Sequence, residues 1–182
     1  RADSDTRRAA QTVIYRLLDA LTRMLTPILA FTAEEIWSFM PHAKADAPEA
    51  AIFNEIPRPG FFPRDEAFLA RWERIHAVRD DVKKTLEPAR AAKLIGSSLD
   101  ARVTLYAEGE LLEFLRAAET LLPAALIVSQ LWIREGKGGE SGEVEGLGVG
   151  VEHAGGDKCA RCWTYSETVG QAAHTDLCAR CA

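Results

Sequence analysis

The sequence predicts a mainly α fold, in which a partial helical bundle is followed by a small α+β unit and a C-terminal four-cysteine zinc knuckle. Apolar residues recur at helical three- and four-residue steps up to about residue 94. Beyond residue 100, short segments alternate apolar and polar residues, as half-buried strands do. All four cysteines fall in the last 24 residues. We therefore expect a helical domain at 1–96, an α+β unit at 97–154 and a zinc finger at 155–182.

A first helix is expected near the start of the chain, with Asp3, Ser4 and Asp5 as possible N-caps. Pro27 should kink or end this helix, because proline lacks the backbone N–H that a helix interior needs. Its apolar residues follow the spacing of one buried helical stripe. They are Ala10, Val13, Ile14, Leu17, Leu18, Leu21, Met24, Leu25 and Ile28.

Two further helices are expected in the first domain. The segment Thr32–Glu35 has the pattern of a capping box and predicts a helix start at Thr32, with a stop at Pro41. Five prolines in 41–63 then predict an irregular connection. A long helix is expected from about 65 to 94, with Pro88 inside it. Its predicted apolar face is made of Phe68, Trp72, Ile75, Val82 and Leu86.

The segment after residue 97 predicts a small α+β unit. Alternating apolar residues predict strands at 101–107, at 131–134 and around 147–151. Helical segments are expected at 110–118 and 121–128, and a glycine-rich turn at 136–142.

The four cysteines form two CxxC pairs with fifteen residues between them, a spacing typical of a zinc site. The predicted ligands are Cys159, Cys162, Cys178 and Cys181. Four thiolates complete a tetrahedral shell and leave no position for water, which predicts one structural zinc and no metal catalysis. The alternative is disulfides or unused thiols, and His153 or His174 could replace a cysteine as ligand.

Basic and aromatic residues lie between these cysteines. Lys158, Arg161 and Arg180 could contact phosphates, and Trp163 could stack on a base. The alternative for Trp163 is a small hydrophobic core inside the knuckle.

Three stretches resemble a known family. Residues 25–37, LTPILAFTAEEIW, look like the segment P-I-L-x-F-T-A-E-E-x-W in the helical anticodon-binding domain of class I synthetases for isoleucine, valine and leucine. Residues 89–108, with ARAAKLIGSSLDA followed by VTLYAE, are similar to the isoleucine-specific continuation. The cysteine pairs in KCARCW and CARC resemble the C-terminal zinc finger of bacterial isoleucyl-tRNA synthetases, a type shared with formamidopyrimidine-DNA glycosylases.

This resemblance implies a tRNA-recognition module of an ATP-dependent ligase in protein biosynthesis. Its partners would be the anticodon stem-loop of tRNA for isoleucine and the catalytic domain of the same enzyme. Candidate RNA contacts on the long helix are Arg79, Lys83, Arg90 and Lys93, which lie within about 80° of one another around the helix. That side overlaps the apolar face, so these side chains could instead extend from the edge of a packed surface.

The resemblance also indicates which functions are missing. The family's HIGH-type and KMSKS-type motifs do not occur here, so no catalytic residue is expected. ATP and magnesium would bind only in the full-length enzyme. Two other functions stay open: a zinc-stabilised scaffold that packs on its own enzyme, and a DNA-glycosylase finger. The chain begins Arg1–Asp3 and so lacks the N-terminal proline nucleophile of those glycosylases.

Composition agrees with a cytoplasmic protein that does not enter a membrane, because no apolar run approaches the length of a membrane helix. The net charge of −5 disfavours indiscriminate nucleic-acid binding.

By the resemblance, the chain begins after the first helices of its bundle, so we expect an uncovered apolar stripe and self-association, most simply as a two-fold dimer. The residues concerned are Val13, Leu17, Leu21 and Met24, or the adjoining Ile36 and Phe39.

Overall fold

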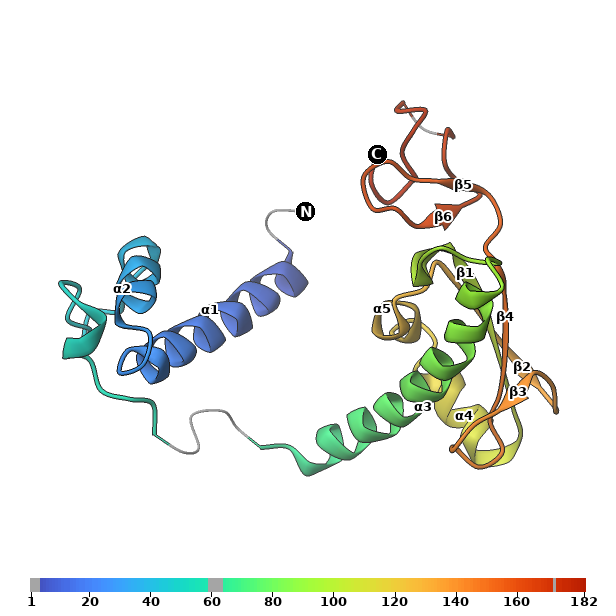
Figure 1. The fold of residues 1–182 in the computed structure, drawn as a ribbon, viewed down its shortest axis with the longest axis horizontal. Coiled ribbons are helices and arrows are strands. Elements are labelled where there is room, and N and C mark those ends of the chain that lie inside the picture. Colours follow the sequence, from blue (N-terminus) through green and yellow to red (C-terminus); the bar gives the residue numbers. More distant parts are fainter. Residues whose placement is uncertain (1–3, 59–63, 172) are drawn as a thin grey trace. The chain divides into compact units, whose positions relative to one another are not determined.

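The computed structural model describes residues 4–58, 64–171 and 173–182. The chain divides into two compact units, Arg1–Arg64 and Asp65–Ala182. The elements of both units are labelled in Figure 1.

The first unit is a helical pair. Helix α1 spans Asp5–Leu25, and Ser4 is its N-cap, whose hydroxyl accepts a hydrogen bond from the Arg7 N–H at 3.3 Å. It ends two residues before Pro27, as predicted. Helix α2 spans Ala30–Phe39, and a short 3-10 helix, η1, spans Ala51–Phe53.

The predicted capping box at Thr32 is wrong. Helix α2 already begins at Ala30, where Leu29 is the N-cap without a side-chain hydrogen bond. The Ala33 N–H donates to the Leu29 carbonyl at 2.8 Å, which places Thr32 inside the first turn. The Glu34 carboxylate instead accepts the N–H groups at the start of η1, from Ala51 at 3.0 Å and from Ile52 at 3.3 Å. This acidic residue therefore ties α2 to the connection that follows it.

Much of the apolar stripe on α1 is exposed. Only Ala20 and Thr22 of this helix are buried. Val13, Leu17, Leu21 and Met24 are each about half exposed, at 52%, 46%, 51% and 54%. The uncovered stripe that the sequence predicts is therefore present on this helix, and self-association through it stays a prediction.

The second unit contains a four-stranded sheet with the strand order β2-β1-β4-β3. Strands β1 and β2 are parallel, and β4 is antiparallel to both β1 and β3. Helices α4 and α5 make the crossover from β1 to β2. The elements are α3 (Glu66–Ala91), η2 (Ser98–Asp100), β1 (Ala101–Ala107), α4 (Gly109–Ala117), α5 (Leu122–Leu126), β2 (Gln130–Glu135), β3 (Glu140–Ser141) and β4 (Gly148–His153). The three predicted strands and two predicted helices of this unit are confirmed, with small shifts at their ends.

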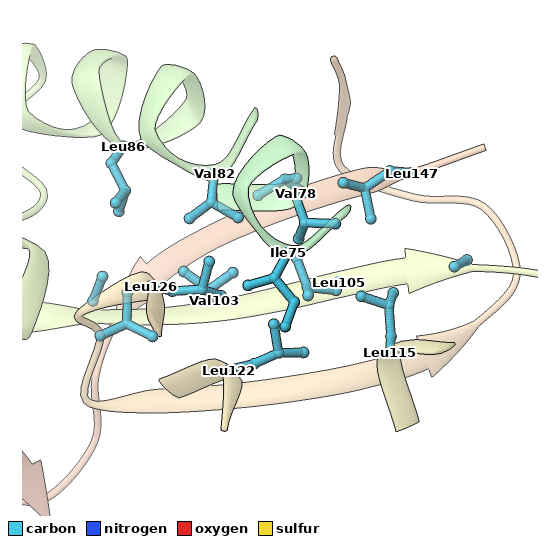
Figure 2. Close-up of a cluster of buried hydrophobic side chains, with 14 of the residues drawn as sticks. Ile75, Val78, Val82, Leu86, Val103, Leu105, Leu115, Leu122, Leu126 and Leu147 are labelled. Atoms are coloured by element: carbon cyan, nitrogen blue, oxygen red, sulfur yellow. The ribbon is translucent and has the colours of Figure 1, made fainter. Parts of the chain in front are cut away.

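One face of the sheet carries the hydrophobic core, shown in Figure 2. Helices α3, α4 and α5 all contribute to it. Side chains of α3 meet β1 residues of the same face, including Val103 and Leu105, which are fully buried. Figure 2 labels Ile75, Val78, Val82, Leu86, Val103, Leu105, Leu115, Leu122, Leu126 and Leu147.

Helix α3 lies in the second compact unit, because its apolar side packs on the sheet. The helical domain expected at 1–96 stays a prediction. The predicted face is also partly displaced, because Phe68 is 56% exposed while Val78 and Ala89 are buried. Pro88 lies inside the helix without ending it.

No helix within the described residues is long and apolar enough to cross a bilayer.

A buried carboxylate fixes the turn between β3 and β4 to α3. Asp81 is 2% exposed, and its two oxygens accept the N–H groups of Glu143 at 2.9 Å and Val144 at 2.8 Å. Gly142 lies directly against the carboxylate, where a Cβ atom would collide with it. The turn therefore depends on one charged side chain from the helix.

We predict that Asp81→Ala lowers the free energy of unfolding by about 1–3 kcal/mol, because two backbone donors lose their acceptor. Urea denaturation followed by circular dichroism measures this. The matched control is Asp80→Ala, one position away, whose exposed side chain pairs with Lys83 at 3.2 Å. That control should change the free energy by less than about 1 kcal/mol. Equal losses in both variants would contradict the role given to Asp81.

Candidate metal centre and adjoining basic surface

The four cysteine sulfurs gather at one point. The Sγ atoms of Cys159, Cys162, Cys178 and Cys181 all lie within 4.8 Å of one another. The Cys162 and Cys178 sulfurs are 3.7 Å apart. Four sulfurs around a zinc ion at about 2.3 Å would be roughly 3.8 Å apart, so the cluster has the size of a tetrahedral zinc shell.

Short hairpin and turn segments hold the sulfurs in place. Strand β5 (Asp157–Lys158) pairs with β6 (Tyr165–Ser166), and the first cysteine pair lies in the loop between them. In this loop the Trp163 N–H donates to the Cys159 carbonyl at 2.9 Å, with Trp163 at a φ of 64°. From the second pair, the Cys178 N–H points to the Cys159 sulfur at 3.4 Å. Backbone donors thus already face a sulfur that would carry negative charge.

The electrostatics of the cluster favour a bound cation. Burial raises the pKa of the Cys162 thiol, but hydrogen bonds from Thr164, Cys159 and Cys181 outweigh it and lower this pKa to about 5. Burial and the neighbouring thiols, Cys162 first among them, raise the pKa of Cys181 to about 12. One thiolate thus opposes ionisation of another in the same cluster. A divalent cation would remove that conflict by neutralising several thiolates together.

The described part of the structure shows no disulfide among the cysteines and no histidine placed as a metal ligand. All four cysteines are free thiols. In the described part of the chain, they are the one group of Cys, His, Asp and Glu placed to share a metal ion. His153 packs edge-on against Tyr165, with ring centroids 4.9 Å apart, and its Nδ1 lies 2.8 Å from the Ala154 carbonyl. His174 is exposed.

The finger is attached to the α+β unit by polar contacts from the start of β2. The Ser129 hydroxyl donates to the Leu99 carbonyl and accepts the Tyr165 N–H at 2.8 Å. The Gln130 amide exchanges two hydrogen bonds with the Gly155 backbone, each of 3.0 Å. The sequence analysis missed both residues, since neither serine nor glutamine at a strand start has a distinctive pattern.

A second contact joins the finger to the segment between α3 and β1. The Asp100 carboxylate accepts the N–H groups of Gly96 at 3.0 Å and Ser97 at 2.7 Å, and the Lys158 ammonium lies 3.5 Å from it. Burial raises the pKa of Asp100, but the Ser97 and Gly96 hydrogen bonds and the Lys158 charge outweigh this and lower it below its ordinary value. The carboxylate therefore stays charged and holds both the loop and the lysine.

Three of the predicted RNA contacts come together at this junction. Arg90 and Lys93 line a pocket of about 580 Å³ with His153. The His153 ring touches Tyr165, and the Lys158 ammonium lies 5.7 Å from the centre of the same Tyr165 ring. The end of α3 and the start of the finger thus share one surface that carries several basic side chains, which we call the junction surface. In it, Arg90 pairs with Glu87 and Lys158 with Asp100. Its members are Arg90, Lys93, His153 and Lys158.

The other candidates lie further back on α3 or contact the cysteine cluster from exposed positions. Arg79 and Lys83 precede Arg90 on α3 by about 16 and 10 Å of helix. The Arg161 guanidinium donates to the Cys181 carbonyl at 3.2 Å. Hydrogen bonds and charge from the Cys162 and Cys181 sulfurs raise the pKa of Arg180. Both arginines of the finger are thus turned toward the cysteine cluster.

Trp163 is available for stacking. Its side chain is 62% exposed, so it is no core residue of the knuckle. The Lys158 ammonium lies 5.5 Å from its ring centre, which places a cation and an aromatic face side by side at the edge of the junction surface.

Comparison with known proteins gives this arrangement a family. Residues 1–105 match the model of the anticodon-binding domain of tRNA ligase. The chain belongs to this family. Residues 156–182 match the zinc finger found in FPG and IleRS, over the segment that carries the four cysteines.

Three relatives match this anticodon-binding chain over nearly its whole length. Each is an isoleucine–tRNA ligase, and the chain spans only about a fifth of their length. The protein from Desulforudis audaxviator is 46% identical over 100% of the chain and 20% of its own length. The proteins from Geobacter sulfurreducens and Carboxydothermus hydrogenoformans are 45% and 47% identical, over 20% and 19% of their lengths.

We predict that Ser129→Ala loosens the finger, because the Tyr165 N–H loses its acceptor. Amide hydrogen exchange at Tyr165 should become roughly five- to a hundredfold faster, the equivalent of one unsatisfied donor. Ser38→Ala is the matched control, since the Ser38 hydroxyl makes a 2.7 Å bond to Glu35 within α2 only. Unchanged exchange at Tyr165 would mean that other contacts hold the finger.

Proposed function

We propose that this chain is the tRNA-recognition module of an isoleucine–tRNA ligase and binds the anticodon stem-loop of tRNA for isoleucine. The observation that carries the proposal is the junction surface. In it, Arg90 at the end of α3 and Lys93 just after the helix share a pocket with His153, which connects through Tyr165 to Lys158 of the finger. The exposed Trp163 adjoins Lys158, and the chain belongs to the anticodon-binding family.

The chemistry of this surface fits an RNA loop. Arginine and lysine side chains anchor phosphates and set the register of a bound strand, without reading sequence themselves. Unpaired loop bases can stack on an aromatic ring, which is how proteins usually read single-stranded RNA. Because the chain as a whole carries a charge of −5, attraction to RNA has to come from such a local surface.

We propose that Cys159, Cys162, Cys178 and Cys181 hold one structural zinc ion. The closed set of four sulfurs leaves no ligand position for water, so the ion would stabilise the fold of the finger. It would keep the turn that presents Lys158 and Trp163 to the RNA. Arg161 and Arg180 would support the metal centre through the contacts described above.

The charging reaction would depend on other parts of a longer ligase. In that enzyme, ATP and magnesium would serve the catalytic domain, which would be a partner of this chain, and this chain alone would attach no amino acid. Such a role belongs in the cytoplasm, where protein is synthesised.

A scaffold function is the second candidate, favoured by the way Ser129 and Gln130 attach the finger to the sheet. On this view the zinc would only stabilise a surface that packs on other domains. The two functions differ in one respect, because only RNA recognition requires the junction surface to accept a polyanion. A DNA-glycosylase finger is disfavoured, because the match to the anticodon-binding family covers residues 1–105.

We predict about one zinc ion per chain, measured by elemental analysis of reduced protein. Removal of zinc by a chelator should unfold 157–182, because metal binding and folding of such a knuckle are coupled. The helices should keep their circular dichroism, since their buried contacts are independent of the finger. Cys178→Ser should lose the ion and His174→Ala should keep it. Zinc-free protein with a folded finger would refute the metal centre.

We predict that tRNA affinity depends on the junction surface. Lys93→Gln and Lys158→Gln should each lower the slope of log affinity against log salt by about one, the effect of one lost phosphate contact. Trp163→Leu should weaken binding by about 1–3 kcal/mol, the worth of one stacked base. Fluorescence anisotropy of the 182-residue chain with labelled tRNA, between about 50 and 200 mM salt, measures both.

Lys83→Gln is the matched control for these variants, because Lys83 lies on α3 but outside the junction surface. Zinc content should be unchanged in every variant, which separates loss of contact from loss of folding. If tRNA binds with the same affinity and salt slope in all the variants, the scaffold function is the better one.

A further inference from the structure

The second face of the sheet carries an aromatic and basic strip that the proposed function does not use. Helices α3, α4 and α5 pack on the core face, and Figure 1 shows them on one side of the strands. On β1 the alternate residues Arg102, Thr104 and Tyr106 point to the other face. In register on β2 lie Gln130, Trp132 and Arg134. We call these six residues the open face.

Trp132 is the centre of the open face. Its side chain is 42% exposed. The guanidinium carbon of Arg102 lies 4.1 Å from its ring centre, and that of Arg134 lies 5.1 Å away. Thr104 is the partner of Trp132 in register and is only 6% exposed. Two cations therefore flank one aromatic ring, in contacts that cation–π attraction stabilises.

The neighbouring strand leaves room beside these rings. Gly150 and Gly148 of β4 are the partners in register of Thr104 and Tyr106. A Cβ atom at Gly150 would lie 3.5 Å from the Tyr106 ring, an ordinary contact distance. Gly148 is buried beneath the Gly138 backbone, which also lies close to the Tyr106 ring. The accessible part of this face is therefore the end that carries Arg102, Trp132 and Arg134, where β4 contributes no side chain at Gly150.

The charges of the open face favour an anion. Glu152 of β4 is its one acidic neighbour in register with β1, and it forms an ion pair with Arg102. Arg134 is exposed and forms no ion pair with any described residue within 4.0 Å. Trp132 is the only large apolar side chain of this face that is exposed among the described residues. A protein interface would need a larger apolar core than one ring supplies.

We propose that the open face is a second RNA-binding surface, which takes a short run of unpaired nucleotides. Bases would stack on Trp132 and on the guanidinium planes beside it, and Arg134 would contact a phosphate. Stacking platforms of this kind bind single strands and not duplexes, because only unpaired bases offer their faces. The proposal rests on the proposed function in one respect: a tRNA would supply such unpaired bases.

The test uses the intact 182-residue chain and an unpaired RNA oligomer of about eight nucleotides, with its duplex as the comparison. The chain has four tryptophans, so its indole N–H groups give a spectrum in which single variants assign each signal. We expect the single strand to shift the Trp132 signal and the duplex to leave it in place. Trp132→Leu should weaken binding of the oligomer about tenfold, and Trp132→Phe should retain most of it.

Arg134→Gln gives a second measure if Trp132→Leu fails to fold, because Arg134 is exposed and covers no core residue. It should lower the salt slope of oligomer binding by about one. If only the Trp163 signal shifts, the open face is not a binding site and the proposed function stands. If Trp132 shifts and Trp163 does not, the open face binds RNA and stacking at the junction surface is wrong. If affinity is unaffected by Trp132→Leu and Arg134→Gln, the open face does not bind RNA and this proposal fails.

Discussion

The apolar packing of α3 on the sheet determines where the end of this helix and its basic side chains lie. Ile75, Val78 and Val82 are at most 1% exposed against Val103 and Leu105, and each such side chain contributes about 1.5–3 kcal/mol when fully buried. With the helix fixed along the sheet, its last turn comes beside the start of β1. Arg90, Lys93 and the Asp100 loop are therefore neighbours of the finger because of hydrophobic packing further along the helix.

The fold of the finger does not depend on apolar packing of this kind. Its segment is short, its buried cysteines Cys159 and Cys178 take the place of a hydrophobic core, and its thiols oppose one another's ionisation. A cation would stabilise the knuckle internally, while Ser129, Gln130 and Asp100 fix its orientation on the sheet. Metal binding and docking are thus separate requirements. A finger that keeps its ion but loses the Ser129 contact would stay folded. Its Lys158 and Trp163 side chains would, however, be displaced relative to the sheet.

Local patterns in the sequence were enough for the strand at 101–107, for the end of α1 before Pro27 and for the cysteine set. Each of these depends on residues close together in the chain. The assignment of α3 to a domain could not be made in this way, because its apolar stripe fits equally well against helices or a sheet. The docking residues and the open face depend on strand register, which places Trp132 beside Thr104 and Gln130 beside Arg102. This strand pairing cannot be derived from the spacing of residues in the sequence.

The junction surface and the open face are connected through the first residues of β1. Asp100 holds Lys158 on the junction side, and Arg102, two residues later, flanks Trp132 on the open face. Gln130, the partner of Arg102 in register, holds the finger at Gly155. The pairing of β1 with β2 therefore sets two things together: the place where the finger is attached and the cations that flank Trp132.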